Sequence, residues 1–165
     1  MKNMGNKEWN RIIRSRQGFT LIEAIVVLLI MGIVSAVIVS QASMSLDSTV
    51  VAEAEALKSQ FRYAQRRAMT TGDSWGIQIS GNSYTMFNYD GTRTNVAMPG
   101  ATDMTKSLGA LGITVTGATV SFDSWGRPCS GETGVTALAS NLSLTVTKGS
   151  KSKNITITKN TGFIP

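Results

Sequence analysis

The chain has 165 residues, a length that suits one domain with a modest hydrophobic core. Apolar residues make up 42% of it and charged residues only 16%, which argues against a disordered chain and favours a membrane segment or a β-rich domain. Histidine is absent and Cys129 is the single cysteine, so histidine-dependent hydrolase triads, internal disulfides and thiolate zinc clusters are excluded. We expect no catalytic group, no metal and no cofactor.

The positive charge is concentrated at the N-terminus. The formal net charge is +6, and residues 1–17 carry five basic side chains against the single acid Glu8. The remainder of the chain has only a small excess of positive charge. The overall charge therefore does not by itself indicate a nucleic-acid-binding domain.

Residues 19–39 form an apolar run, FTLIEAIVVLLIMGIVSAVIV. As a helix the run would span about 30 Å, the thickness of the hydrocarbon core of a bilayer. The basic arm before it predicts that residues 1–18 stay in the cytoplasm and that the rest of the chain lies outside. Because Gly18 precedes the run and no small-residue cleavage site follows Val39, we expect cleavage on the cytoplasmic side, with the apolar helix retained.

Residues 47–72 are predicted to continue as an amphipathic helix that stops at Gly72. Its apolar stripe has helical spacing and is expected to pack on a sheet: Val50, Ala54, Leu57, Phe61, Ala64 and Ala68. A second row, Lys58, Arg62 and Arg66, either contacts acids on a neighbouring subunit or is simply solvated.

From residue 73 to residue 165 the pattern changes to the alternation of β-strands. Strands are predicted at 75–79, 84–87, 113–116, 119–122, 142–147 and 154–158, with short strands in a long loop at 88–112. The last two strands form a hairpin with one apolar face: Leu142, Leu144, Val146, Ile155 and Ile157. Cys129 is expected to be a small buried residue.

The junction from Arg16 to Glu23, RQGFTLIE, resembles the processing site of type IV pilins and type II secretion pseudopilins. The resemblance implies that a prepilin peptidase cuts after Gly18 and methylates the new amine of Phe19. A carboxylate within an apolar span costs about 2.5–3.5 kcal/mol, so Glu23 needs a partner. In a filament, the amine of Phe19 of a neighbouring subunit can neutralise it and fix the axial register.

The overall layout resembles the FimT/GspH class of minor pilins and pseudopilins, on residues 60–68 (QFRYAQRRA), 120–126 (VSFDSWG) and Thr161-Gly162. This implies an α+β pilin fold, in which a long N-terminal helix packs on an antiparallel β-rich domain. Residues 1–18 would be the leader, 19–46 the transmembrane and assembly helix, 47–72 the amphipathic half and 73–165 the β-rich domain. Before assembly the subunit would span the inner membrane once, in contact with lipid, with its domain in the periplasm. Its partners would be the prepilin peptidase, other subunits and the inner-membrane assembly platform, within a pilus or pseudopilus.

Three other interpretations remain open at this point. The chain can be a major pilin, or a single-span anchored enzyme if Gly18 is not cut. It can also be a tip subunit that captures DNA through the basic hairpin tip formed by Lys148, Lys151 and Lys153. Exposed lysines also commonly keep strand edges soluble, which would require no nucleic acid.

Overall fold

The structure is a computed structural model that describes the backbone of residues 19–165 and the side chains of residues 19–38 and 48–165. Gly18 and the expected leader lie outside the described residues. The chain divides after Ser40 into two units, and each is described by itself.

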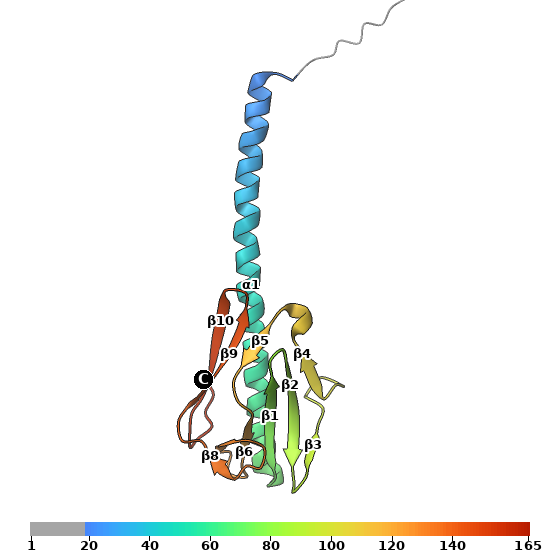
Figure 1. Cartoon of the computed structure of the whole chain (residues 1–165), viewed down its shortest axis with the longest axis vertical. Helices are drawn as coiled ribbons and strands as arrows, with labels where there is room; N and C mark the ends of the chain where they lie inside the picture. The colour runs from blue at the N-terminus through green and yellow to red at the C-terminus, as the bar shows by residue number, and fades with distance from the viewer. Residues whose placement is uncertain (1–18) are drawn as a thin grey trace, which may run out of the picture. The chain divides into compact units, whose positions relative to one another are not determined.

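One long helix, α1 (Leu21–Thr71), supplies residues to both units (Figure 1). It ends where the sequence predicts, because the N–H of Gly72 donates to the carbonyl of Ala68 at 3.0 Å and Gly72 has a φ of 82°. Residues with a side chain rarely adopt this left-handed conformation, so glycine stops the helix at little cost.

The larger sheet is antiparallel, with the strand order β3-β2-β1-β6-β7-β8. The tight turn at Gly81-Asn82 pairs Ser80 with Ser83, and β3 and β4 pair with opposite ends of β2. The strands are β1 (Ser74–Ser80), β2 (Ser83–Tyr89), β3 (Arg93–Asn95), β4 (Thr105–Ser107), β6 (Val120–Phe122), β7 (Pro128–Ser130) and β8 (Thr136–Ala137).

The smaller sheet has the order β10-β9-β5, with strands β5 (Thr114–Thr116), β9 (Leu142–Lys148) and β10 (Lys151–Ile157). A short 3-10 helix, Gly109–Leu111, precedes β5. The β9–β10 register pairs Lys148 with Lys151 at the tip and Leu142 with Ile157 at the other end. The predicted apolar face is confirmed, since four of its members are buried and Leu142 is half-buried.

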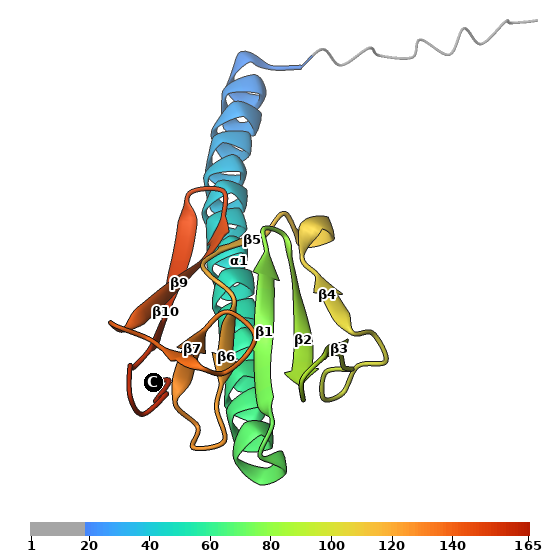
Figure 2. The ribbon, with the colours of Figure 1, turned by 60° about the horizontal axis from the view of Figure 1, so that its bottom comes forward.

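The hydrophobic core lies between the sheets and the domain part of α1. Figure 2 shows α1 running behind β1, with β2–β4 to one side and β9 and β10 to the other. All six residues of the predicted stripe are buried, and they join side chains from both sheets, among them Ile77, Phe122 and Ile155. The helix therefore closes the core of the domain on one side.

The six predicted strands are confirmed, with bounds within two residues except that β10 begins three residues before the predicted start. The loop at 88–112 contains β3, β4 and the 3-10 helix. Strands β7 and β8 were not predicted, because segments of three and two residues are too short to show alternation.

Candidate functional site

The start of α1 carries the predicted assembly residues Phe19 and Glu23. Phe19 precedes the helix and is 79% exposed, and Glu23 is exposed in the first helical turn. No cationic side chain lies within ion-pair distance of Glu23 among residues 19–38 and 48–165. Within this described part of the chain, the Glu23 carboxylate has no cationic partner and lies on a mainly apolar surface.

Thr20 caps this helix and was not singled out from the sequence. Its Oγ1 accepts a hydrogen bond from the N–H of Glu23 at 3.3 Å, and its carbonyl accepts one from the N–H of Ala24 at 3.2 Å. The spacing Thr-x-x-Glu is that of a capping box, so the signal was present in the sequence. Since the backbone of Glu23 makes this contact, a change of its side chain leaves the cap in place.

The first part of α1 is exposed on every side. Leu21–Ile38 is long and apolar enough to cross a membrane, with a mean hydropathy of 2.9 over 18 residues, and none of it is buried within the chain. The hydroxyl of Ser35 donates to the carbonyl of Met31 at 2.7 Å, so this polar group is satisfied within the helix. Such a surface needs cover from lipid or from other apolar helices.

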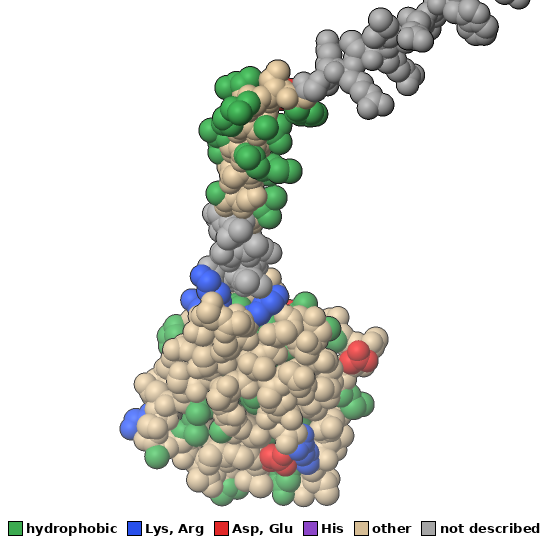
Figure 3. All heavy atoms as spheres, turned by 45° about the horizontal axis from the view of Figure 1, so that its top comes forward, with side chains coloured by type: hydrophobic (Ala, Val, Ile, Leu, Met, Phe, Trp, Pro, Cys, Tyr) green, Lys and Arg blue, Asp and Glu red, His purple; other side chains and the backbone are tan. Residues whose placement is uncertain are grey.

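The predicted basic tip, hereafter the lysine tip, forms at the β9–β10 turn from Lys148, Lys151 and Lys153. Lys153 is exposed and the other two are half-buried. Basic side chains lie along the upper rim of the domain in Figure 3. The pKa of Glu55 on α1 is lowered, chiefly by a hydrogen bond from Lys58, and the charges of Lys153 and Arg62 act in the same direction. Lys153 thus lies on the side of α1 that carries Glu55.

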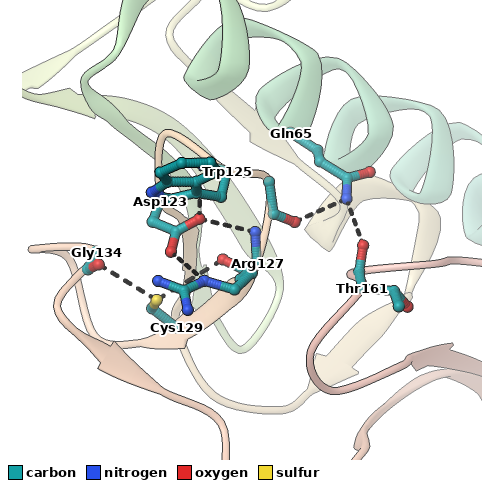
Figure 4. A network of polar contacts seen from close by, with 8 residues as sticks. Gln65, Asp123, Trp125, Arg127, Cys129, Gly134 and Thr161 are labelled. Carbon is teal, nitrogen blue, oxygen red and sulfur yellow. Dashed lines mark hydrogen bonds and ion pairs between the residues drawn. The ribbon is translucent and has the colours of Figure 1, made fainter.

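The three sequence motifs that carry the resemblance to the FimT/GspH class meet at Gln65, on α1 (Figure 4). Its Nε2 donates to the carbonyls of Gly126 at 2.8 Å and of Thr161 at 3.0 Å. The first acceptor belongs to the turn after β6, and the second to the segment after β10. The helix motif QFRYAQRRA, the turn motif VSFDSWG and Thr161-Gly162 are therefore parts of one structural joint.

The turn after β6 is held from within by Asp123. Its Oδ1 accepts the N–H groups of Trp125 at 3.0 Å and Arg127 at 2.8 Å, and its Oδ2 lies 2.7 Å from Nε of Arg127 (Figure 4). This leaves Trp125 79% exposed. Every polar group of Asp123 is engaged in shaping the turn, which is a structural role.

The solvated interpretation of the row Lys58, Arg62 and Arg66 was wrong for Lys58. Lys58 is buried and pairs with Glu55 at 2.8 Å. Arg62 donates to the carbonyl of Ile164 at 2.9 Å. Lys58 finds its partner within α1 itself, whereas Arg62 reaches the segment after β10. Arg62 and Arg66 are both exposed, as the solvated interpretation expected.

Cys129 is 1% exposed, as expected for a small core residue. Burial raises the pKa of its thiol, with the nearby Asp123 carboxylate adding to the effect, and Sγ donates to the carbonyl of Gly134 at 3.3 Å. These features make the thiol unreactive at neutral pH. Among the described residues no group of three metal-ligating side chains comes together.

Comparisons with known proteins agree with this layout. Residues 13–39 match the family model for the prokaryotic N-terminal methylation motif, and residues 53–162 match the model for the type II transport protein GspH. No curated protein matches the chain. Two structures of the minor pseudopilin EpsH from the type 2 secretion system of Vibrio cholerae are similar in fold, each with 12% identity and a TM-score of 0.53. The alignments cover 70% and 72% of this chain, and 94% and 93% of EpsH.

The likeness to EpsH supports the α+β pilin fold, and the match to the GspH model covers about two thirds of the chain, from the amphipathic part of α1 to the segment after β10. The methylation motif covers the junction at Gly18 and the whole apolar run. The chain belongs to the GspH family, a family of structural pseudopilins, and carries the N-terminal motif of subunits that a prepilin peptidase processes.

Proposed function

We propose that this chain is a minor subunit of a type II secretion pseudopilus or a related type IV pilus, with a structural rather than a catalytic role. One observation supports this above the others: an apolar helix exposed on every side carries a single carboxylate, Glu23, four residues after Phe19. Before assembly a bilayer covers this helix, and in the filament the apolar helices of neighbouring subunits cover it.

Glu23 and Phe19 form the assembly contact in this proposal. Cleavage after Gly18 creates one new amine, at Phe19, and this amine stays positive when it is methylated. Each subunit then carries one cation and one carboxylate about one helical turn apart. Pairing each carboxylate with the amine of the next subunit satisfies every charge in the apolar bundle and selects one axial register.

The remaining assignments follow from the same scheme. Residues 1–18 are the cytoplasmic leader, 19–46 the membrane and assembly helix, 47–72 its amphipathic continuation and 73–165 the periplasmic domain. The prepilin peptidase acts first, and the inner-membrane assembly platform and the other subunits act afterwards.

Mass spectrometry of sheared filaments tests the processing and the copy number together. We expect an N-terminal peptide that begins at methylated Phe19, present in trace amounts relative to the main subunit. A filament made mainly of this chain would identify a major pilin instead. An uncut N-terminus in the mature protein would contradict the proposal and favour an anchored protein outside the pilin class.

A substitution of Glu23 tests the assembly contact. We expect Glu23→Gln to leave membrane insertion and processing intact, because the helix cap uses the backbone of residue 23. Incorporation into filaments should fall at least about tenfold, because the amine of the next subunit loses its buried partner. Asp103→Asn is the matched control, since it also removes one carboxylate, from an exposed position of the domain. Normal incorporation of Glu23→Gln would exclude the register mechanism.

A further inference from the structure

We propose that the lysine tip binds anionic phospholipid headgroups of the membrane in which the apolar part of α1 is anchored. Lys148, Lys151 and Lys153 would then form a second, electrostatic contact with the bilayer. The inference rests on the proposed function in one respect: Leu21–Ile38 must be embedded in a bilayer before assembly.

Chain length keeps the domain close to that bilayer. Only residues 39–47 separate the candidate span, which ends at Ile38, from the first described side chain of the domain, Ser48. Along a helix these residues cover only about 15 Å. This is less than twice the Debye length of about 10 Å in 0.1 M salt, so an anionic surface is felt at that range.

Within the domain, the lysine tip lies at the end where α1 enters. In Figure 1 the β9–β10 turn, where Lys148 pairs with Lys151, lies beside α1 at the end of the domain where the helix enters. On the other side, Lys106 on β4 lies 3.8 Å from Glu53 of α1. Glu53 and Glu55 are two residues apart, so they point to different sides of the helix. Lysines from β10 and from β4 therefore flank α1 on both sides near its entry into the domain.

Two of the acids near this end have ion-pair partners outside the lysine tip. Glu55 accepts a hydrogen bond from Lys58 at 2.8 Å, and Glu53 has Lys106 as its nearest cation. Each acid therefore has a lysine of its own outside the tip. Asp47 is the other acid of the sequence between residues 39 and 57. The three positive charges of the lysine tip thus outnumber the one negative charge that remains in this stretch.

The chemistry favours lipid over nucleic acid. Each lysine close to an anionic membrane strengthens binding by roughly fivefold, without requiring a shaped pocket. Tethering through α1 also supplies the lipid at a high local concentration, which DNA would lack. Single-stranded nucleic acid is usually held on aromatic rings, and residues 147–154 contain none.

Lysine acetylation in proteoliposomes tests the proposal with the unmodified full chain. The protein is reconstituted in phosphatidylcholine vesicles, with or without about 30% phosphatidylglycerol, and treated with a membrane-impermeant acetylating reagent. Mass spectrometry then gives a rate for each lysine. Lys159 is the internal control, because it is exposed and follows the opposite end of β10, about 20 Å from the tip.

We expect the rates at Lys148, Lys151 and Lys153 to fall at least about threefold when phosphatidylglycerol is present at low salt, with Lys159 unchanged. Raising the salt to about 1 M should restore them, because the Debye length shrinks to about 3 Å. Equal rates in the two kinds of vesicle would overturn the proposal. Protection by added duplex DNA but not by phosphatidylglycerol would also overturn it, in favour of nucleic acid.

Flotation of the same vesicles separates this inference from the proposed function. Failure of the chain to float with neutral vesicles would contradict the membrane anchor itself. A chain that floats and resists alkaline extraction but shows no lipid-dependent protection would contradict only the role of the lysine tip.

Discussion

The two parts of α1 have different surroundings although they belong to one continuous helix. From Leu21 to Ile38 the helix is apolar on every side, and none of that surface is buried within the chain. From Val50 to Ala68 it is apolar along one stripe, and that stripe is completely buried. The part that is apolar on every side must be shielded from water by lipid or by other chains. The part with one apolar stripe packs that stripe against the two sheets. Hydrophobicity alone therefore does not identify a core; its distribution around the helix does.

The same substitution in the two parts should have very different effects on folding. Leu57 is 1% exposed and Leu28 is 69% exposed. We expect Leu57→Ala to lower the free energy of unfolding of the domain by about 2–5 kcal/mol, because it leaves a cavity under the sheets. Leu28→Ala should change it by less than about 0.5 kcal/mol. Urea unfolding of the full chain in detergent micelles measures both changes. Equal effects would contradict the conclusion that only the second part of α1 contributes to the core of the domain.

A substitution in the segment that follows β10 can weaken the packing of that segment against α1. Gly162 has a φ of 63°, and a Cβ there would lie 2.5 Å from Nε2 of Gln65 and 2.6 Å from the carbonyl oxygen of Gly126. We expect Gly162→Ala to cost about 1–3 kcal/mol from this collision, in addition to the backbone strain. Gly149→Ala is the matched control, because Gly149 has a φ of 58° and no atom within 4 Å of the added carbon. A similar loss of stability in both variants would show that the joint at Gln65 adds nothing.

Tyr84 on β2 should make the stability of the domain depend on pH in the alkaline range. Burial, with the Glu53 carboxylate adding to it, raises the pKa of Tyr84 from 10.0 to about 12. Between these values the unfolded chain loses the phenol proton and the native domain keeps it, so the stability falls as the pH rises. The expected slope is about 1.4 kcal/mol per pH unit.

Tyr84→Phe should flatten the pH response while leaving the stability near pH 7 little changed. Burial also raises the pKa of the Cys129 thiol, so both chains are compared in a Cys129→Ala background. Chemical unfolding at a series of pH values provides the measurement. An unchanged slope in Tyr84→Phe would show that Tyr84 is not the titrating group.

Much of the fold could be predicted because its elements are long and periodic. The stripe from Val50 to Ala68 and the alternation in β9 and β10 each extend over several residues, and both are confirmed. Strands β7 and β8 escaped prediction because their pairing comes from tertiary contacts rather than from local pattern. Lys58 was expected on an open surface, but Glu55 three residues earlier supplies a partner that allows its burial.

Some residues of the candidate site could likewise be predicted from the sequence, and others could not. Phe19, Glu23 and the lysine tip are visible in the sequence because charge and hydropathy change abruptly around them. The joint at Gln65 is not, since it depends on which carbonyls the chain brings to the helix from positions 61 and 96 residues later. The spacing of residues along a helix predicts which of them share a face. Hydrogen-bond acceptors that lie far along the chain produce no such local pattern in the sequence.

The bond from Arg62 to the carbonyl of Ile164 joins residues that are 102 positions apart. The ribosome therefore makes the stripe of α1 long before it makes the segment that covers this side of it. During that interval the helix is tethered by its apolar half, with its second half still uncovered. Folding of the domain thus waits for late residues, and an interruption of synthesis between the two would leave an anchored chain with an open core, an obvious substrate for quality-control proteases.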